Sequence, residues 1–135
     1  MKEYKAQVVE LSVEDCLDRG AWRNFAGIAK LEPGLNHRQP EGVSDTVSYR
    51  ISIDTGIEIP GELFVASAWV TGWYCPPGRP QTCIVKSVTP RICKDRIAKV
   101  DMDIGLAGEL NIYTVGFSCL APGNEAPVDD LSDHG

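Results

Sequence analysis

The cysteines have the widest chemical range of any residues in this chain, and two of them flank a proline-rich stretch. Cys75 and Cys83 enclose the seven residues PPGRPQT. Structural zinc sites usually place paired thiols two to four residues apart, because one turn then aims both sulfurs at the ion. No two of the five cysteines stand that close together, so the spacing does not favour a metal site. We interpret the stretch as a stiff hairpin loop with reduced thiols at its base, and leave open whether the two thiols pair or bind a metal together.

Two tryptophans could form the wall of a ligand pocket. Trp69 and Trp73 are four residues apart in a stretch typical of a strand, so we expect them on one face with the Thr71 hydroxyl between them. Flat amphipathic rings beside a hydroxyl suit a small apolar or cyclic ligand. Trp22 could join them from another element. The alternative is that these rings fill the hydrophobic core.

Two loop residues are candidates for contact with a partner protein. Arg79 stands at the tip of the proline-rich loop, and His37 lies in a long polar stretch, residues 31–45, that we expect to be a loop. Loops beside a rigid β scaffold often carry binding residues. His37 would also be the base of any Ser/His or Cys/His mechanism, but no serine stands in a nucleophile-elbow sequence. These residues therefore predict no catalytic set.

The tripeptide Asp54-Thr55-Gly56 follows an alternating stretch, ISI, and resembles the catalytic motif of retropepsin-like aspartic proteases. The resemblance implies a homodimer in which Asp54 of each subunit shares one proton with its partner. Ile57 departs from the pattern, because the family has a small residue there. The resemblance covers about nine residues, and Asp and Gly are also favoured in tight turns for backbone reasons. A homodimeric protease is thus the alternative function, and a hairpin turn is the interpretation that we adopt.

Period-2 alternation of apolar and polar residues runs through most of the chain and predicts strands. It is clearest in residues 47–53 and 98–104, and residues 4–11 and 110–120 are further candidates. Residues 63–74 are apolar on both faces, so we expect a central strand there, with residues 82–88 as its hairpin partner. Helical signals are limited to residues 12–20, a short segment opened by Pro90, and an ambiguous stretch over 21–34. The prediction is a mainly β fold, an antiparallel sandwich or barrel with one to three short helices, and the alternative is α+β with a single antiparallel sheet.

Length and charge set the remaining expectations. The 135 residues suit one domain over residues 1–120, followed by an acidic and disordered tail over 121–135. The formal net charge is −6, four of the acids lie after residue 120, and no basic patch occurs. We therefore expect neither a nucleic acid nor a membrane as partner. The first residues lack the apolar region of a secretory signal, so we expect a cytoplasmic protein.

These observations favour binding over catalysis. No glycine-rich phosphate loop is present, and we expect no cofactor. The prediction is a small non-enzymatic binding protein, with either a small-molecule pocket lined by aromatic residues or a surface that binds or inhibits another protein. A homodimer is left open, since strand edges and a long two-sided strand can pair with a second copy.

Overall fold

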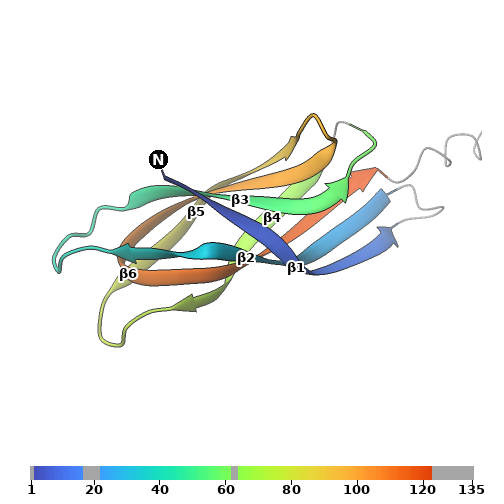
Figure 1. Ribbon diagram of the computed structural model, residues 1–135. Helices are drawn as coiled ribbons and strands as arrows, with labels where there is room; N and C mark the ends of the chain where they lie inside the picture. Colours follow the sequence, from blue (N-terminus) through green and yellow to red (C-terminus); the bar gives the residue numbers. More distant parts are fainter. Residues whose placement is uncertain (1, 17–21, 62–63, 123–135) are drawn as a thin grey trace, which may run out of the picture.

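The computed structural model describes residues 2–16, 22–61 and 64–122, and these residues form six strands without a helix (Figure 1). The prediction of a mainly β, barrel-like fold is confirmed. The strands are β1 (Lys2–Cys16), β2 (Trp22–Arg38), β3 (Val47–Glu58), β4 (Val65–Tyr74), β5 (Gln81–Ile92) and β6 (Ile97–Pro122).

Four of the strands close a ring. β1 pairs antiparallel with β2 and parallel with β3, and both of these strands pair antiparallel with β6. β6 can close the ring because its first half pairs with β3 and its second half pairs with β2. Figure 1 shows β6 curving around one end of the barrel. Gly108, with φ of 85°, lies between the two halves. Glycine adopts this left-handed conformation at little steric cost because it has no Cβ.

The core lies inside this ring and follows the predicted alternation. Ile51 and Ile53 of β3 are fully buried, and they face the first half of β6. Both halves of β6 contribute side chains that are at most 1% exposed: Val100, Met102, Ile104, Leu106, Ile112, Val115, Phe117, Cys119 and Ala121. A single core therefore joins all parts of the ring.

The predicted short helices are absent from the described residues. β1 continues through residues 12–16 because that segment pairs with β2, while residues 17–20 lie outside the described residues. The ambiguous stretch over 22–34 is part of β2, where pairing with two neighbours satisfies the backbone. After β5 ends at Ile92, a tight turn at residues 93–96 replaces the other helix, with Arg96 at φ of 69°. Long-range pairing has outweighed weak local helix signals.

The expectations for residues 31–45 and 63–74 are also corrected. The polar stretch is a loop only from residue 39 onward, because β2 runs on to Arg38 and pairs with β6. β4 is not central, since β6 is its only strand neighbour in the described part of the chain. β5 is not its hairpin partner, because β5 pairs with β6 as well. The last strand, β6, ends at Pro122.

No helix among the described residues is long and apolar enough to cross a membrane.

Candidate functional site

β4 and β5 lie along β6 without pairing with each other. β4 pairs with residues 111–120 of β6, and β5 pairs with residues 98–108. In the described part of the chain, neither strand has a ladder on its other edge. The two edges therefore keep backbone N–H and C=O groups that a further strand could use.

A hollow of about 390 Å³ lies between these two strands. Val70 and Trp73 of β4 form one side, and Val85 of β5 lies on the other. Leu110 of β6, which is only 3% exposed, also lines the hollow and belongs to the core. The remaining lining residues are Cys75, Gln81 and Cys83. The hollow has no acidic or basic side chain in its lining, so it suits an apolar group.

The edge of β4 lacks charge and proline, two of the devices that usually prevent strand pairing, and its two register shifts are confined to the part between Val70 and Trp73. Its sequence, VASAWVTGWY, contains no charged residue and no proline. β5 differs, because it carries Lys86 beside a register shift and then Pro90 and Arg91. Charged side chains, bulges and proline are the common means of blunting an edge strand. The β4 edge is therefore open to regular pairing over residues 65–70, whereas the β5 edge is protected along much of its length.

The predicted tryptophan pocket is not assembled as expected. Trp73 is 58% exposed and lines the hollow, whereas Trp69 does not line it and lies against Gly116 of β6. Two register shifts in β4, between Val70 and Trp73, interrupt the alternation that would have put both rings on one face. Thr71 bonds with Thr114 across these shifts, the two hydroxyl oxygens being 2.9 Å apart.

Trp22 is distant from this site along the sheet. It begins β2, where it pairs with Pro122 at the last residue of β6. Trp73 instead pairs with Ile112, ten residues earlier in β6. The structure thus places only one of the three predicted tryptophans at the hollow.

His37 is a buried structural residue rather than part of an exposed loop. It lies near the end of β2 and is 4% exposed. Its Nε2 is 2.9 Å from Gln39 Oε1, and its Nδ1 is 2.6 Å from the Tyr49 hydroxyl. Because an amide oxygen only accepts, Nε2–H donates to Gln39. The same Gln39 oxygen also accepts from the Gly108 N–H, 3.0 Å away. His37 and Gly108 thus both hold Gln39, the first residue of the loop, in place.

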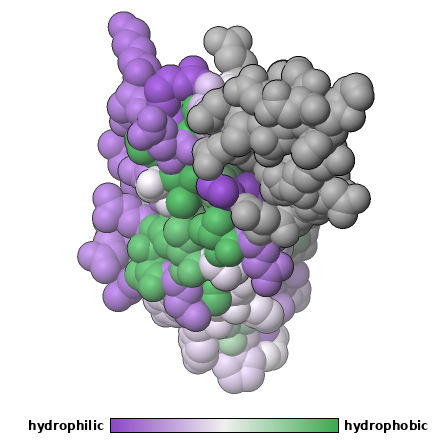
Figure 2. All heavy atoms as spheres, turned by 90° about the vertical axis from the view of Figure 1, so that its right-hand side faces the viewer, coloured by the Kyte–Doolittle hydropathy of each residue, from purple (hydrophilic) through white to green (hydrophobic). Residues whose placement is uncertain are grey.

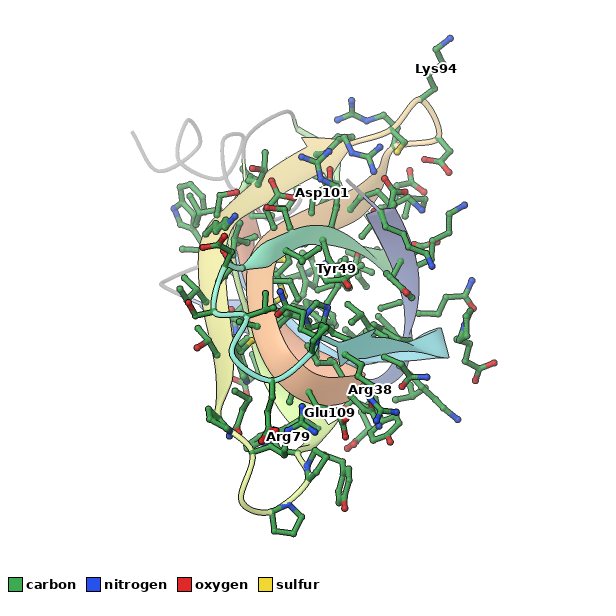
Figure 3. All side chains as sticks on the ribbon, turned by 90° about the vertical axis from the view of Figure 1, so that its left-hand side faces the viewer. Arg38, Tyr49, Arg79, Lys94, Asp101 and Glu109 are labelled. Carbon is green, nitrogen blue, oxygen red and sulfur yellow. The ribbon has the colours of Figure 1, made fainter. Side chains whose placement is uncertain are left out.

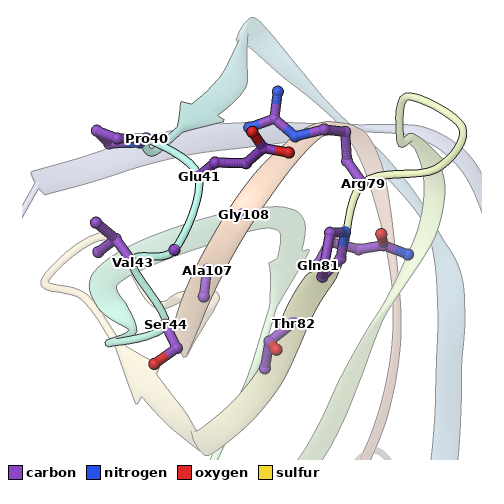
Figure 4. A pocket seen from close by; sticks show the side chains of 11 residues that line it. Pro40, Glu41, Val43, Ser44, Arg79, Gln81, Thr82, Ala107 and Gly108 are labelled. Carbon is purple, nitrogen blue, oxygen red and sulfur yellow. The ribbon is translucent and has the colours of Figure 1, made fainter.

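Arg79 does lie in a loop, at the mouth of a second, smaller hollow between residues 40–44 and 79–82 (Figure 4). Its guanidinium donates to the Gln39 carbonyl at 3.4 Å and lies 4.0 Å from the Glu109 carboxylate. Glu109 also pairs with Arg38 at 3.1 Å, and Figure 3 shows these three side chains together at this end of the barrel. Arg79 therefore has internal partners that compete with any external anion.

The contacts of Asp54 are those of a turn residue. Its Oδ1 accepts from the Gly56 N–H at 3.0 Å, and its Oδ2 is 2.8 Å from Lys99 Nζ. Burial alone would raise the pKa of Asp54, but these hydrogen bonds outweigh it and lower the pKa below its ordinary value. Thr55 donates to the Ala98 carbonyl at 2.7 Å. The Asp-Thr-Gly sequence thus closes a bulge between β3 and β6, with Gly56 at φ of 69°.

Two aspartates on the outer face of β6 anchor its neighbours. Asp101 accepts from Arg91 of β5 at 3.0 Å and from Ser52 of β3 at 2.8 Å. Asp103 accepts from Arg50 of β3 at 2.7 Å. The resulting network holds β3 and β5 to the first half of β6. Among the described residues, no three His, Cys, Asp or Glu side chains are grouped so as to hold a metal ion.

Sequence reasoning missed Val70 and Val85 as lining residues, and it missed the open edge of β4. One signal was available: residues 63–74 contain no charge, which is unusual for a strand that faces water. We interpreted that run as a buried central strand, because apolar residues on both faces are also typical of that position. The interpretation as an edge strand follows only from the pairing in the structure, where β4 and β5 both pair with β6.

Comparison with protein-family models, with curated proteins and with solved structures finds no match to this chain.

Proposed function

We propose that this protein is a binding module that receives an extended segment of a partner protein along the free edge of β4. The observation that carries the proposal is the uncharged edge of β4, which no other described strand pairs with, beside an apolar hollow. An added strand gains main-chain hydrogen bonds from such an edge, and pockets for alternate side chains supply specificity. One apolar side chain of the segment would enter the hollow next to Trp73.

The surface of β4 supports this proposal. Val65, Trp69, Trp73 and Tyr74 are 44–62% exposed, although their side chains are large and apolar or aromatic. Aromatic residues are enriched at the centres of protein interfaces. The net charge of −6 favours the approach of neutral or basic segments over acidic ones.

The proposal is tested with a displayed library of random decapeptides, selected on the native protein. We expect enrichment of segments with apolar residues at alternate positions, because such segments can pair with β4 and fill the hollow. Trp73→Ala should weaken their binding by about 10-fold or more, in line with the loss of an aromatic anchor. Trp22→Ala is the matched control, since the same residue type is removed in β2, away from β4 and the hollow.

A second pair of variants tests the edge itself. Ser67→Lys puts a charge on the open strand, and Thr89→Lys puts the same charge on β5, which already carries Lys86. Peptide binding that is lost in the first variant and retained in the second supports strand addition at β4. Equal loss in both variants, or no enrichment from the library, would contradict it.

A small apolar ligand is the second candidate, and the volume and uncharged lining of the hollow favour it. Such a ligand would contact the Trp73 ring, so its addition should change tryptophan fluorescence in the native protein and not in Trp73→Ala. A panel of small apolar and cyclic compounds that leaves the emission unchanged would remove this candidate.

A further inference from the structure

Cys75 and Cys83 reach the same hollow from its two sides. Cys75 directly follows β4, and Cys83 is the third residue of β5. Both line the hollow beside Trp73. The seven residues between them include three prolines, which limit the conformations of the loop and hold its two ends in place.

Electrostatics also indicates that the two thiols are neighbours. Burial raises the pKa of the Cys83 thiol, and the nearby Cys75 raises it further. This effect agrees with the position of both cysteines in the lining of the same hollow. Neither cysteine is fully buried, so a small oxidant in solution can reach the pair.

We propose that Cys75 and Cys83 form a reversible disulfide that closes the hollow between β4 and β5. The oxidant is a low-molecular-weight disulfide such as glutathione disulfide. One protein thiolate attacks a sulfur of the oxidant, forms a mixed disulfide and releases one glutathione thiolate. The second protein thiolate then attacks the protein sulfur of the mixed disulfide and releases the second glutathione. The protein loses two hydrogens, and glutathione disulfide becomes two molecules of glutathione.

Two other cysteines are poorer candidates for this chemistry. Cys119 is 1% exposed, and burial raises the pKa of its thiol to about 12. It therefore forms little thiolate, which is the reactive species. The Cys93 sulfur accepts a hydrogen bond from Arg91 at 3.2 Å, in the turn between β5 and β6, and it does not line the hollow.

The disulfide would control binding, and this part of the inference rests on the proposed function. A bond between Cys75 and Cys83 ties the end of β4 to the start of β5 across the lining of the hollow. It would exclude the side chain that an added segment places next to Trp73. The oxidised protein should then bind the selected decapeptides about 10-fold or more weakly than the reduced protein.

The test uses the full chain in glutathione buffers of increasing oxidised fraction, quenched with N-ethylmaleimide and followed by intact mass and peptide mapping. We expect the loss of two hydrogens, with N-ethylmaleimide on neither Cys75 nor Cys83, and full reversal by added glutathione. Cys93→Ser should leave this result unchanged. Cys75→Ser should instead retain a mixed glutathione disulfide on Cys83, because the resolving thiol is gone.

Two results would overturn the proposal: free Cys75 and Cys83 thiols at the highest ratio of oxidised to reduced glutathione, or stable mixed disulfides on both cysteines. A retained β-type circular dichroism spectrum shows that the protein is still folded in these samples. A link between any other two cysteines would also overturn the proposal. The mass readout does not depend on binding. A disulfide that forms while Trp73→Ala still binds the peptides normally would therefore refute the proposed function and leave the thiol pair standing.

Discussion

At the scale of single residues, the side chains with the most chemical promise in the sequence are held in structural contacts. Asp54 bonds to a turn N–H and to Lys99, and His37 is buried between Tyr49 and Gln39. Such contacts hold each side chain in one orientation, and those of Asp54 also favour its charged form. The residues that remain available for binding are the uncharged ones, above all Trp73.

The Asp54 contacts give a pH-dependent stability. The pKa of Asp54 is lower in the folded chain than in the unfolded chain. Its ion pair therefore stabilises the fold at any pH above the ordinary Asp pKa. This stabilisation is lost as the pH falls through the pKa that Asp54 has in the folded chain. We expect Asp54→Asn to lower the free energy of unfolding by about 0.5–1 kcal/mol at pH 7. The difference from the native chain should fade between about pH 5 and pH 2.

Urea denaturation across this pH range measures the effect, and Asp95→Asn is the matched control. Asp95 accepts from the Ile97 N–H at 2.9 Å in the same way that Asp54 accepts from Gly56, but no lysine pairs with it among the described ion pairs. A pH-independent difference for Asp54→Asn, or an equal one for Asp95→Asn, would contradict the assignment.

Asp101 should matter more for stability than Asp103. Its side chain is 10% exposed and that of Asp103 is 19% exposed, and its removal leaves the hydroxyl of Ser52 without its acceptor. We expect Asp101→Ala to cost about 2 kcal/mol and Asp103→Ala about 1 kcal/mol at pH 7. Chemical denaturation of both variants checks this order, and the reverse order would show that the network is centred on Asp103.

At the scale of elements, β6 organises the molecule because it changes direction near Gly108. A Cβ at this position would collide with the Pro80 carbonyl and approach Gln81, and φ is 85°. Gly56 has a similar φ of 69°, but nothing lies where its Cβ would be. Substitutions at the two glycines therefore distinguish the cost of a left-handed backbone from the added cost of a Cβ collision.

This difference gives a prediction for β6. Gly56→Ala should cost about 1 kcal/mol, from the left-handed backbone alone. Gly108→Ala should cost clearly more, about 3 kcal/mol, because β5 must also shift where it begins. Denaturation midpoints of the two variants check this. Equal losses of stability in the two variants would mean that the start of β5 moves away from the added Cβ at little cost.

At the scale of the whole molecule, one ring of strands encloses one core, so unfolding should be a single cooperative event. Ile104 and Phe117 lie in different halves of β6, and both are fully buried. We expect Ile104→Ala to cost about 2–5 kcal/mol and Phe117→Ala about 3–5 kcal/mol. Each variant should lower the same transition, observed together by far-ultraviolet circular dichroism and tryptophan fluorescence. Two separate transitions would show that the halves of the barrel unfold independently.

One end of the molecule carries exposed hydrophobic side chains. Figure 2 views the barrel from the side where the end of β1 and the start of β2 extend, and hydrophobic side chains gather there with hydrophilic ones around them. Val9, Leu11 and Val13 alternate along β1 and are 42–59% exposed. Sedimentation velocity at increasing concentration will show whether these apolar surfaces bring two copies together, as the sequence left open.

The sequence by itself determined the class of the fold and much of the core. Ile51, Ile53, Val100, Met102 and Ile104 are buried as their alternation predicts, because side chains of a strand point to opposite faces whatever the topology. These properties depend only on residue type and on spacing within one segment.

Only the tertiary structure decided which strands are edges and which residues meet. The apolar run of β4 is compatible with a central strand until β6 is seen to be its only strand neighbour in the described part of the chain. Trp69 and Trp73 share a face in a regular strand, but two register shifts separate them. Cys75 and Cys83 share a hollow because β4 and β5 both follow the curved β6. Pairing partners and bulges depend on segments that are distant in sequence, and local patterns carry no information about them.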